Sequence, residues 1–233
     1  MLRRTQLVGL ILCTFIPLSI TGQSINIDSL DLDGDIDRWY DLMIGQTNSS
    51  LQIGAGKENY NFPKTVHPYF DEYSWRKGSI MYRDQIFKDV FLLYDLVDQN
   101  ILLKDVNSEI NLQPIILNQD QVQWFSIEER EFLKIEDYDD GFFEPLFEGA
   151  IYSVYAKRLK EEDISSSSLS FKKDDWYLIQ SGDSFHRIRN KGELFKLIDK
   201  NKAKLISKEN KLKPFTRDGD HLAKLISIYE DEG

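Results

Sequence analysis

The chain has 233 residues, of which 41% are hydrophobic, and its net charge at pH 7 is −10. Residues 23–150 carry 10 basic and 25 acidic side chains, whereas residues 151–233 carry 17 and 14. An acidic body argues against nucleic acid as the main partner, because affinity for nucleic acid depends on neutralising phosphates. The length suits one large domain or a domain with a smaller appendage, with enough apolar residues for a sizeable core.

Residues 1–22 have the pattern of a secretory signal peptide. Arg3 and Arg4 precede an uncharged apolar run over residues 7–20, and small and polar residues close the run. The run is shorter than the roughly 20 residues that a transmembrane helix needs. We expect cleavage after Gly22, export to the periplasm or outer membrane, and no transmembrane segment in the mature chain.

The only cysteine, Cys13, lies inside this apolar run. Lipid attachment at Cys13 is the alternative to cleavage, but Leu12 precedes the cysteine and the apolar run continues past it. Cleavage would remove the thiol, so we expect a mature chain without disulfides or cysteine-ligated metal.

Residues 23–62 form a polar, turn-rich segment. Its alternate aspartates are weak candidates for calcium ligands, because they place hard oxygen atoms along one short loop: Asp31, Asp33, Asp35 and Asp37. Ile36 and Leu42 occupy the positions at which a calcium loop needs Gly and Glu. We therefore favour a solvated acidic turn, with calcium as the alternative.

Residues 63–190 are predicted to form an antiparallel β body. Short apolar segments alternate with turn signals, and the predicted strands are 78–82, 86–96, 101–104, 109–112, 121–125, 131–135, 150–158, 176–180 and 184–188. The Asp140-Gly141 pair predicts a hairpin turn in an acidic stretch that is a second, weaker calcium candidate. The charged and serine-rich residues 160–174 predict a mobile loop that joins two paired strands.

Residues 191–233 are predicted to be a lysine-rich helical segment. Apolar stripes over 194–198, 205–206 and 222–229 have helical spacing, and Thr216 is a candidate cap for the last helix. The lysines either contact anionic headgroups or an acidic partner, or form the solvated face of helices that pack on the sheet, and we favour the solvated face. The whole pattern predicts an α+β fold: an antiparallel β meander or barrel-like body with a C-terminal helical segment.

Two groups of residues carry a resemblance to a protein family. The first group comprises Trp75 and residues 78–82 and 90–97, and the second is a later hairpin with Trp176, Gly182 and His186. These residues are similar to a group of exported, β-rich proteins of Bacteroidota with no assigned activity. The resemblance covers about residues 67–230 and implies a signal peptide, a β-rich body and an envelope location, and it implies no catalytic residue.

The sequence contains no pattern specific for catalysis or a cofactor. It lacks the G-x-S-x-G turn of a serine hydrolase, a phosphate loop and a complete dinucleotide fingerprint. The three histidines, His67, His186 and His221, are too far apart for a local zinc pair. We expect no cofactor.

Aromatic residues in the predicted strands form the remaining candidate site. A possible binding surface for a glycan or peptide comprises Trp75, Tyr94, Trp124 and Trp176. Aromatic residues in strands more often form core and cross-strand pairs.

The leading hypothesis is an exported, non-enzymatic envelope protein that binds or assembles with an envelope protein or glycan. The first alternative is a carboxylate-dependent hydrolase of envelope glycan or peptide, which needs two acidic groups in one cleft. The second alternative is a calcium-stabilised adhesion module.

Overall fold

The structure is a computed structural model that describes residues 51, 55–56, 62–105, 113–135, 138–163, 169–215 and 219–232. The predicted signal peptide, the predicted strand 109–112 and Thr216 lie outside the described residues. So do the calcium candidates Asp31, Asp33, Asp35 and Asp37.

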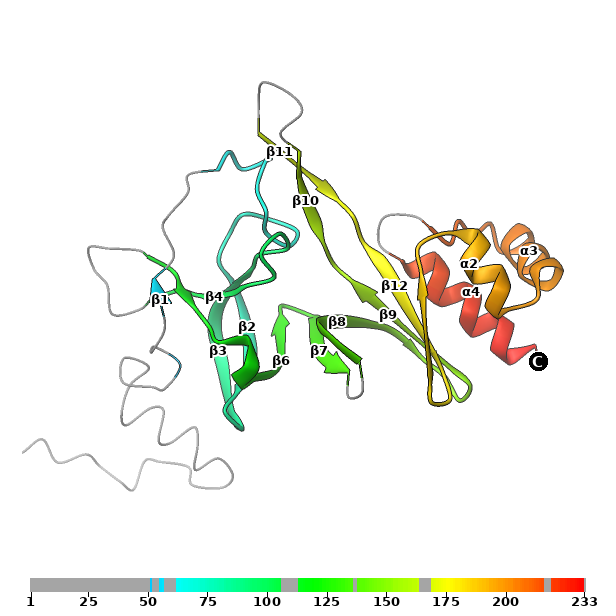
Figure 1. Ribbon diagram of the computed structural model, residues 1–233, viewed down its shortest axis with the longest axis horizontal. Coiled ribbons are helices and arrows are strands. Elements are labelled where there is room, and N and C mark those ends of the chain that lie inside the picture. Colours follow the sequence, from blue (N-terminus) through cyan, green and yellow to red (C-terminus); the bar gives the residue numbers. More distant parts are fainter. Residues whose placement is uncertain are drawn as a thin grey trace, which may run out of the picture.

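An open, eleven-stranded antiparallel sheet forms the body, in the order β1-β5-β4-β3-β2-β6-β7-β8-β9-β12-β13 (Figure 1). Its strands are β1 Ala55–Gly56, β2 Arg76–Tyr82, β3 Gln85–Tyr94, β4 Ile101–Leu103, β5 Ile115–Ile116, β6 Val122–Ile127, β7 Arg130–Ile135, β8 Tyr138–Glu148, β9 Tyr152–Lys157, β12 Trp176–Ser181 and β13 Ser184–Ile188. A separate pair joins β10 Lys160–Asp163 to β11 Ser170–Lys173. Most neighbouring strands of the eleven-stranded sheet are consecutive in the chain, as in a meander. The predicted α+β class is confirmed, and the sheet is not closed into a barrel.

The long strand β8 divides the sheet into two halves. Its first part pairs with β7 through Phe143 and Leu133, and its second part pairs with β9 from Glu144 onward, where Glu144 faces Ala156. The first half of the sheet is β1–β7, and the second half is β9, β12 and β13. The change of partner between Phe143 and Glu144 therefore lies at the centre of the molecule (Figure 1).

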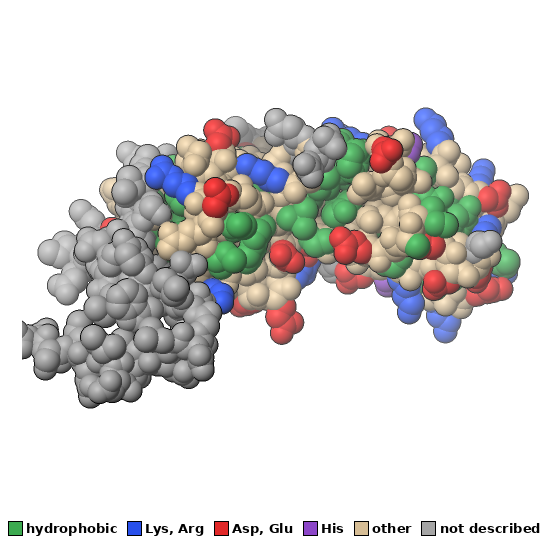
Figure 2. Space-filling view, turned by 90° about the horizontal axis from the view of Figure 1, so that it is seen from below, with side chains coloured by type: hydrophobic (Ala, Val, Ile, Leu, Met, Phe, Trp, Pro, Cys, Tyr) green, Lys and Arg blue, Asp and Glu red, His purple; other side chains and the backbone are tan. Residues whose placement is uncertain are grey.

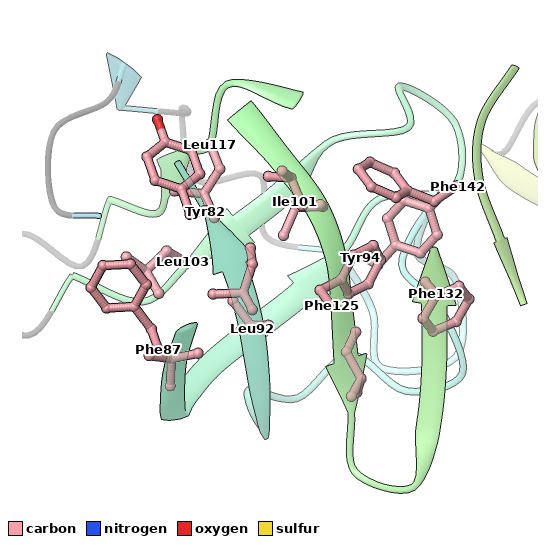
Figure 3. Close-up of a cluster of buried hydrophobic side chains, with 14 of the residues drawn as sticks. Tyr82, Phe87, Leu92, Tyr94, Ile101, Leu103, Leu117, Phe125, Phe132 and Phe142 are labelled. Atoms are coloured by element: carbon pink, nitrogen blue, oxygen red, sulfur yellow. The ribbon is translucent and has the colours of Figure 1, made fainter. Parts of the chain in front are cut away.

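The core of the first half is rich in aromatic side chains (Figure 3). Phe125 of β6 and Phe132 of β7 are cross-strand partners whose rings stack with centroids 4.8 Å apart. Tyr94 and Phe142 pack edge-on against this pair. Phe125 and Ile127 of β6 and Phe132 of β7 are buried and lie on one face, because one face of an open sheet must be removed from water.

Three helices follow the sheet: α2 Lys191–Leu197, α3 Lys200–Glu209 and α4 Asp220–Asp231. Asn190 and Asp199 cap the first two, since each side chain accepts a hydrogen bond from the third residue beyond it. Helix α4 packs on β8 and β9 and shares a core with them, to which it contributes Leu222, Leu225 and Ile226. In α3 the prediction was partly wrong: Ile206 is buried, but Leu205 is 57% exposed.

Gly219 fixes the entry to α4. It has a φ of +77°, and a β-carbon there would lie 2.5 Å from the Tyr177 ring and 2.7 Å from Leu146. A left-handed conformation and a close approach to the sheet both require glycine at this position. The helix can therefore begin directly against β12 and β8.

Two predictions for connecting segments were partly wrong. Residues 160–174 join two paired strands, β9 and β12, as predicted, but residues 160–163 and 170–173 form the ribbon β10–β11, in which Glu161 faces Lys172. The ribbon prolongs the β9–β12 pair and holds few apolar residues, so a hydrophobic pattern does not reveal it (Figure 1). Gly141 lies inside β8 with a φ of +72°, at a register shift against β7, so this glycine serves a bulge rather than a hairpin turn.

Candidate functional site

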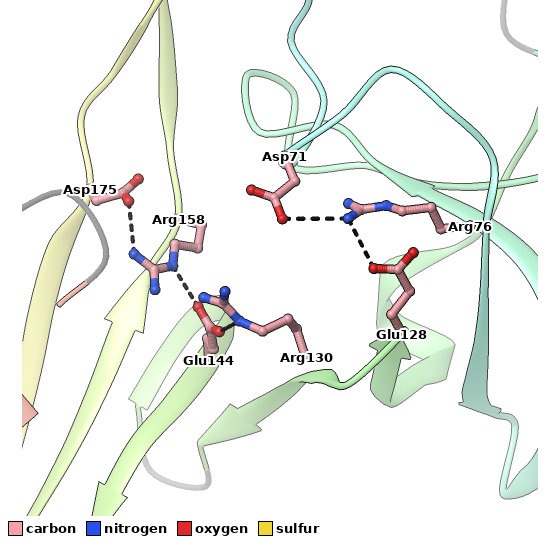
Figure 4. A network of polar contacts seen from close by, with 7 residues as sticks. All are labelled: Asp71, Arg76, Glu128, Arg130, Glu144, Arg158 and Asp175. Carbon is pink, nitrogen blue, oxygen red and sulfur yellow. Dashed lines mark hydrogen bonds and ion pairs between the residues drawn. The ribbon is translucent and has the colours of Figure 1, made fainter. Parts of the chain in front are cut away.

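Four charged residues meet where β8 changes partner, and we call them the junction cluster: Arg130, Glu144, Arg158 and Asp175 (Figure 4). Glu144 accepts hydrogen bonds on both carboxylate oxygens, from Nε of Arg130 and, at 2.6 Å, from Nε of Arg158. Arg158 Nη1 also donates to Asp175 at 2.9 Å. The four residues come from β7, β8 and the breaks that separate β9–β12 from the ribbon, so the cluster joins both halves of the sheet.

The centre of the junction cluster is buried. Glu144 is 3% exposed and Arg158 is 4% exposed. Burial opposes the charge of Arg158, but the carboxylates of Glu144 and Asp175 outweigh it and raise the pKa of Arg158. The hydrogen bond to Glu144 likewise raises the pKa of Arg130. The adjoining cavity of about 20 Å³ has room for about one water molecule. The charges of the cluster therefore bind one another and stabilise the fold, and its buried centre is not accessible to a substrate.

A second, more open set of ion pairs surrounds Arg76 (Figure 4). Nη1 of Arg76 lies 3.5 Å from Asp71 and 3.6 Å from Glu128, and Nη2 donates to the carbonyl oxygen of Phe70 at 2.8 Å. The guanidinium groups of Arg76 and Arg130 both lie within 6 Å of the Phe70 ring centroid, at 5.4 and 5.6 Å. Cation–π contacts thus connect this set to the junction cluster.

His67 belongs to an aromatic cluster beside the ribbon. Its ring stacks near Tyr69 and Tyr73, and its Nδ1 atom is buried without a hydrogen-bond partner among the described residues. Lys160 Nζ donates to the carbonyl oxygens of His67 and Tyr69, at 2.9 and 2.7 Å. Burial lowers the pKa of His67, and the Lys160 ammonium lowers it further. Burial and the facing Lys173 lower the pKa of Lys160 to about 8.

An aromatic pocket of about 290 Å³ opens between the ribbon and the first half of the sheet. Its lining includes Phe62, Phe171 and the carboxylates of Asp95, Asp98 and Glu162. Asp95 is buried, and its Oδ1 accepts hydrogen bonds from the backbone N–H groups of Val97 and Asp98. Asp98 and Glu162 are exposed. Asp95 thus stabilises a turn, and the other two carboxylates lack the burial that typically creates a general acid.

A groove of about 310 Å³ lies among the three helices, and we call it the helical groove. Its walls are apolar and its rim is basic: Leu194, Phe195, Leu212, Pro214 and Leu225 are joined by Ser207 and by Lys191, Lys204 and Lys208. All three lysines are exposed. Across the described residues, none of their ammonium groups has an ion pair. In Figure 2, lysine and arginine side chains project from the helical end and apolar side chains lie among them.

The four predicted aromatic residues do not form one surface. Tyr94 and Trp176 are each 1% exposed and belong to two different core clusters. Tyr94 donates a hydrogen bond to Gln99 at 2.7 Å, and Arg187 stacks 4.0 Å from the Trp176 ring centroid. Trp75 and Trp124 are partly exposed. Trp75 packs on a third cluster, while Trp124 lies on β6 opposite Leu133.

The other histidines lie apart. His186 is on the edge strand β13, and Nδ1 of His221 accepts a hydrogen bond from the backbone N–H of Lys213 at 2.9 Å. In the part of the chain that the structure describes, no three His, Cys, Asp or Glu side chains are grouped so that they could hold a metal ion. No helix among the described residues is long and apolar enough to span a bilayer.

No family model, curated protein or solved structure matches the chain. The resemblance to exported Bacteroidota proteins stays a prediction.

Proposed function

We propose that the protein is an exported, non-enzymatic component of the cell envelope, and that it acts by binding or assembly through the helical groove. One observation carries this proposal: among the described residues, the lysines of the groove have no ion pair and lie beside apolar walls, whereas the charges of the junction cluster are paired with one another. Unpaired cations next to apolar surface are free to take an anionic, partly apolar partner. The export step depends on the pattern of residues 1–22.

Fractionation and crosslinking in cells test this function. The chain should be recovered from the periplasm or outer membrane with its N-terminus at or near Gln23. A saturable crosslink to one envelope component should form and should weaken when Lys191, Lys204 and Lys208 are replaced by Gln. Cytoplasmic retention of the full-length chain, or a crosslink that is indifferent to these lysines, would contradict the proposal.

A carboxylate-dependent hydrolase is the second candidate, because three carboxylates line one aromatic pocket. It predicts hydrolysis of envelope glycan or peptide by the purified chain, with the activity lost in Glu162→Gln. Activity that survives both Glu162→Gln and Asp98→Asn would eliminate this pocket as the active site.

The calcium-stabilised adhesion module stays a third proposal. It predicts that a chelator lowers the melting temperature and that calcium restores it.

A further inference from the structure

We propose that the helical groove binds a single long-chain carboxylate, with its carboxylate group on the lysine rim and its alkyl chain in the groove. The proposal deepens the function given above and depends on it, because it names the chemical class of ligand for the same groove.

The charge of the groove selects the head group. Lys191 comes from α2, and Lys204 and Lys208 lie one turn apart on α3, so three ammonium groups border one opening. The lining contains no carboxylate. The three basic side chains make the rim electropositive, so the rim attracts an anion and repels a cation.

The walls of the groove select the rest of the ligand. Phe195 and Leu212 are half-buried and present apolar surface to the groove, and Leu194 and Leu225 lie fully buried behind this surface. A small anion such as acetate would leave this apolar surface in contact with water. An alkyl chain would cover it, and each methylene removed from water is worth roughly a fourfold gain in affinity.

The size of the groove limits the ligand to one chain. A volume of about 310 Å³ lies at the lower end of the range for small-molecule sites, about 300–1,000 Å³. One alkyl chain fits a volume of this size better than a two-chain lipid does.

Calorimetry on the exported form of the chain tests the proposal, with dodecanoate below its micelle concentration as the probe. We expect saturable binding to one site. Octanoate should bind at least about tenfold more weakly, because it buries fewer methylenes. Dodecyltrimethylammonium, which has the same tail and a positive head, should not bind.

Two pairs of variants separate head group from tail. K191Q/K204Q/K208Q should raise the dissociation constant of dodecanoate about tenfold, through the loss of three favourable charges. The control K196Q/K200Q/K224Q removes one exposed lysine from each helix outside the groove and should leave binding unchanged. Ser207→Trp should block the groove while keeping its charges, and Ser207→Ala should bind like the parent chain.

Three results would overturn the proposal: no saturable binding of dodecanoate, equal binding of the cationic amphiphile, or full affinity in K191Q/K204Q/K208Q. Binding to anionic vesicles without binding of monomeric dodecanoate would also overturn it, in favour of a membrane surface. If dodecanoate fails while the envelope crosslink still requires the three lysines, the proposed function stands and only the carboxylate ligand is wrong.

Discussion

The charged side chains of the junction cluster and of the helical groove differ in burial and in ion pairing. At the junction, Arg158 and Glu144 are almost fully buried, and each charge has an opposite charge within hydrogen-bond distance. At the groove, three lysines stand in water without ion pairs among the described residues. Buried charges are costly unless they are paired, and exposed charges contribute little to stability. We infer that the junction cluster stabilises the fold and that the helical groove is available for a partner.

The largest expected effect comes from breaking the junction cluster. Glu144→Ala should lower the free energy of unfolding by about 3–5 kcal/mol, because it removes a buried carboxylate that accepts hydrogen bonds from Arg130 and from the buried Arg158. Urea unfolding measures this. The matched control is Glu128→Ala, since Glu128 is 59% exposed and its ion pair with Arg76 should be worth at most about 1 kcal/mol. Equal losses of stability in the two variants would contradict the expected difference between buried and exposed ion pairs.

A smaller effect is expected from Asp175→Asn. The amide oxygen keeps the hydrogen bond from the backbone N–H of Leu159, while Arg158 loses one opposite charge. We expect a loss of roughly 1.5–2 kcal/mol, at the lower end of the range for hydrogen bonds to charged groups. Thermal or urea unfolding tests it. A loss as large as that of Glu144→Ala would mean that Asp175, and not Glu144, is the centre of the cluster.

The protonation of His67 should make the free energy of unfolding depend on pH. Its folded-state pKa lies below the unfolded value of about 6.5, so the folded chain binds fewer protons than the unfolded chain at mildly acidic pH. Stability should therefore be full above pH 6.5 and should be lost as the pH falls through the lower, folded-state pKa. His67→Phe keeps the stacked ring and should flatten this loss in urea unfolding between pH 5 and 8. An unchanged pH profile in the variant would assign the acid sensitivity to other groups.

The smallest effect is expected at the groove. K191Q/K204Q/K208Q should change the free energy of unfolding by no more than about 0.5 kcal/mol per site, as is usual for exposed side chains. The same variant is expected to weaken ligand binding, so stability and binding should separate. Marked destabilisation would show that the lysines support the helices rather than a partner.

The sequence predicted the regular elements with strong apolar patterns. Strands β3, β6 and β7 and the buried face of α4 follow directly from alternation or helical spacing. The ribbon β10–β11 was missed because its residues are mainly charged. Its two strands pair because they continue the antiparallel pair β9–β12 beyond the core.

The junction cluster was not predictable from residue types alone. Glu144, Arg158 and Asp175 are separated by 14 and 17 positions in the chain. The register of β8 against β9 brings Glu144 near Arg158, and the register of β9 against β12 brings Asp175 there. One signal was present: Glu144 follows Phe142 and Phe143 inside an apolar strand, a place where a charge needs a partner.

The helical groove was foreseen only as a lysine-rich surface. The spacing of Lys204 and Lys208 places both on one side of α3, but the apolar walls come from three separate segments. The groove exists because α2, α3 and the residues around Pro214 converge, and that convergence is tertiary packing rather than a local pattern.

The shared strand β8 makes the two halves of the sheet mechanically interdependent. Within the sheet, β7 and β9 are connected through this one strand, and Lys160 adds a link outside it by donating from its backbone N–H to the carbonyl oxygen of Leu96. Removing either half would leave β8 with an unpaired edge inside the former core. The chain should accordingly unfold as one cooperative unit, and the amide protons of β8 around Phe143 should be among the last to exchange with solvent. Fragments of the chain that are divided at this strand should aggregate rather than yield two independent domains.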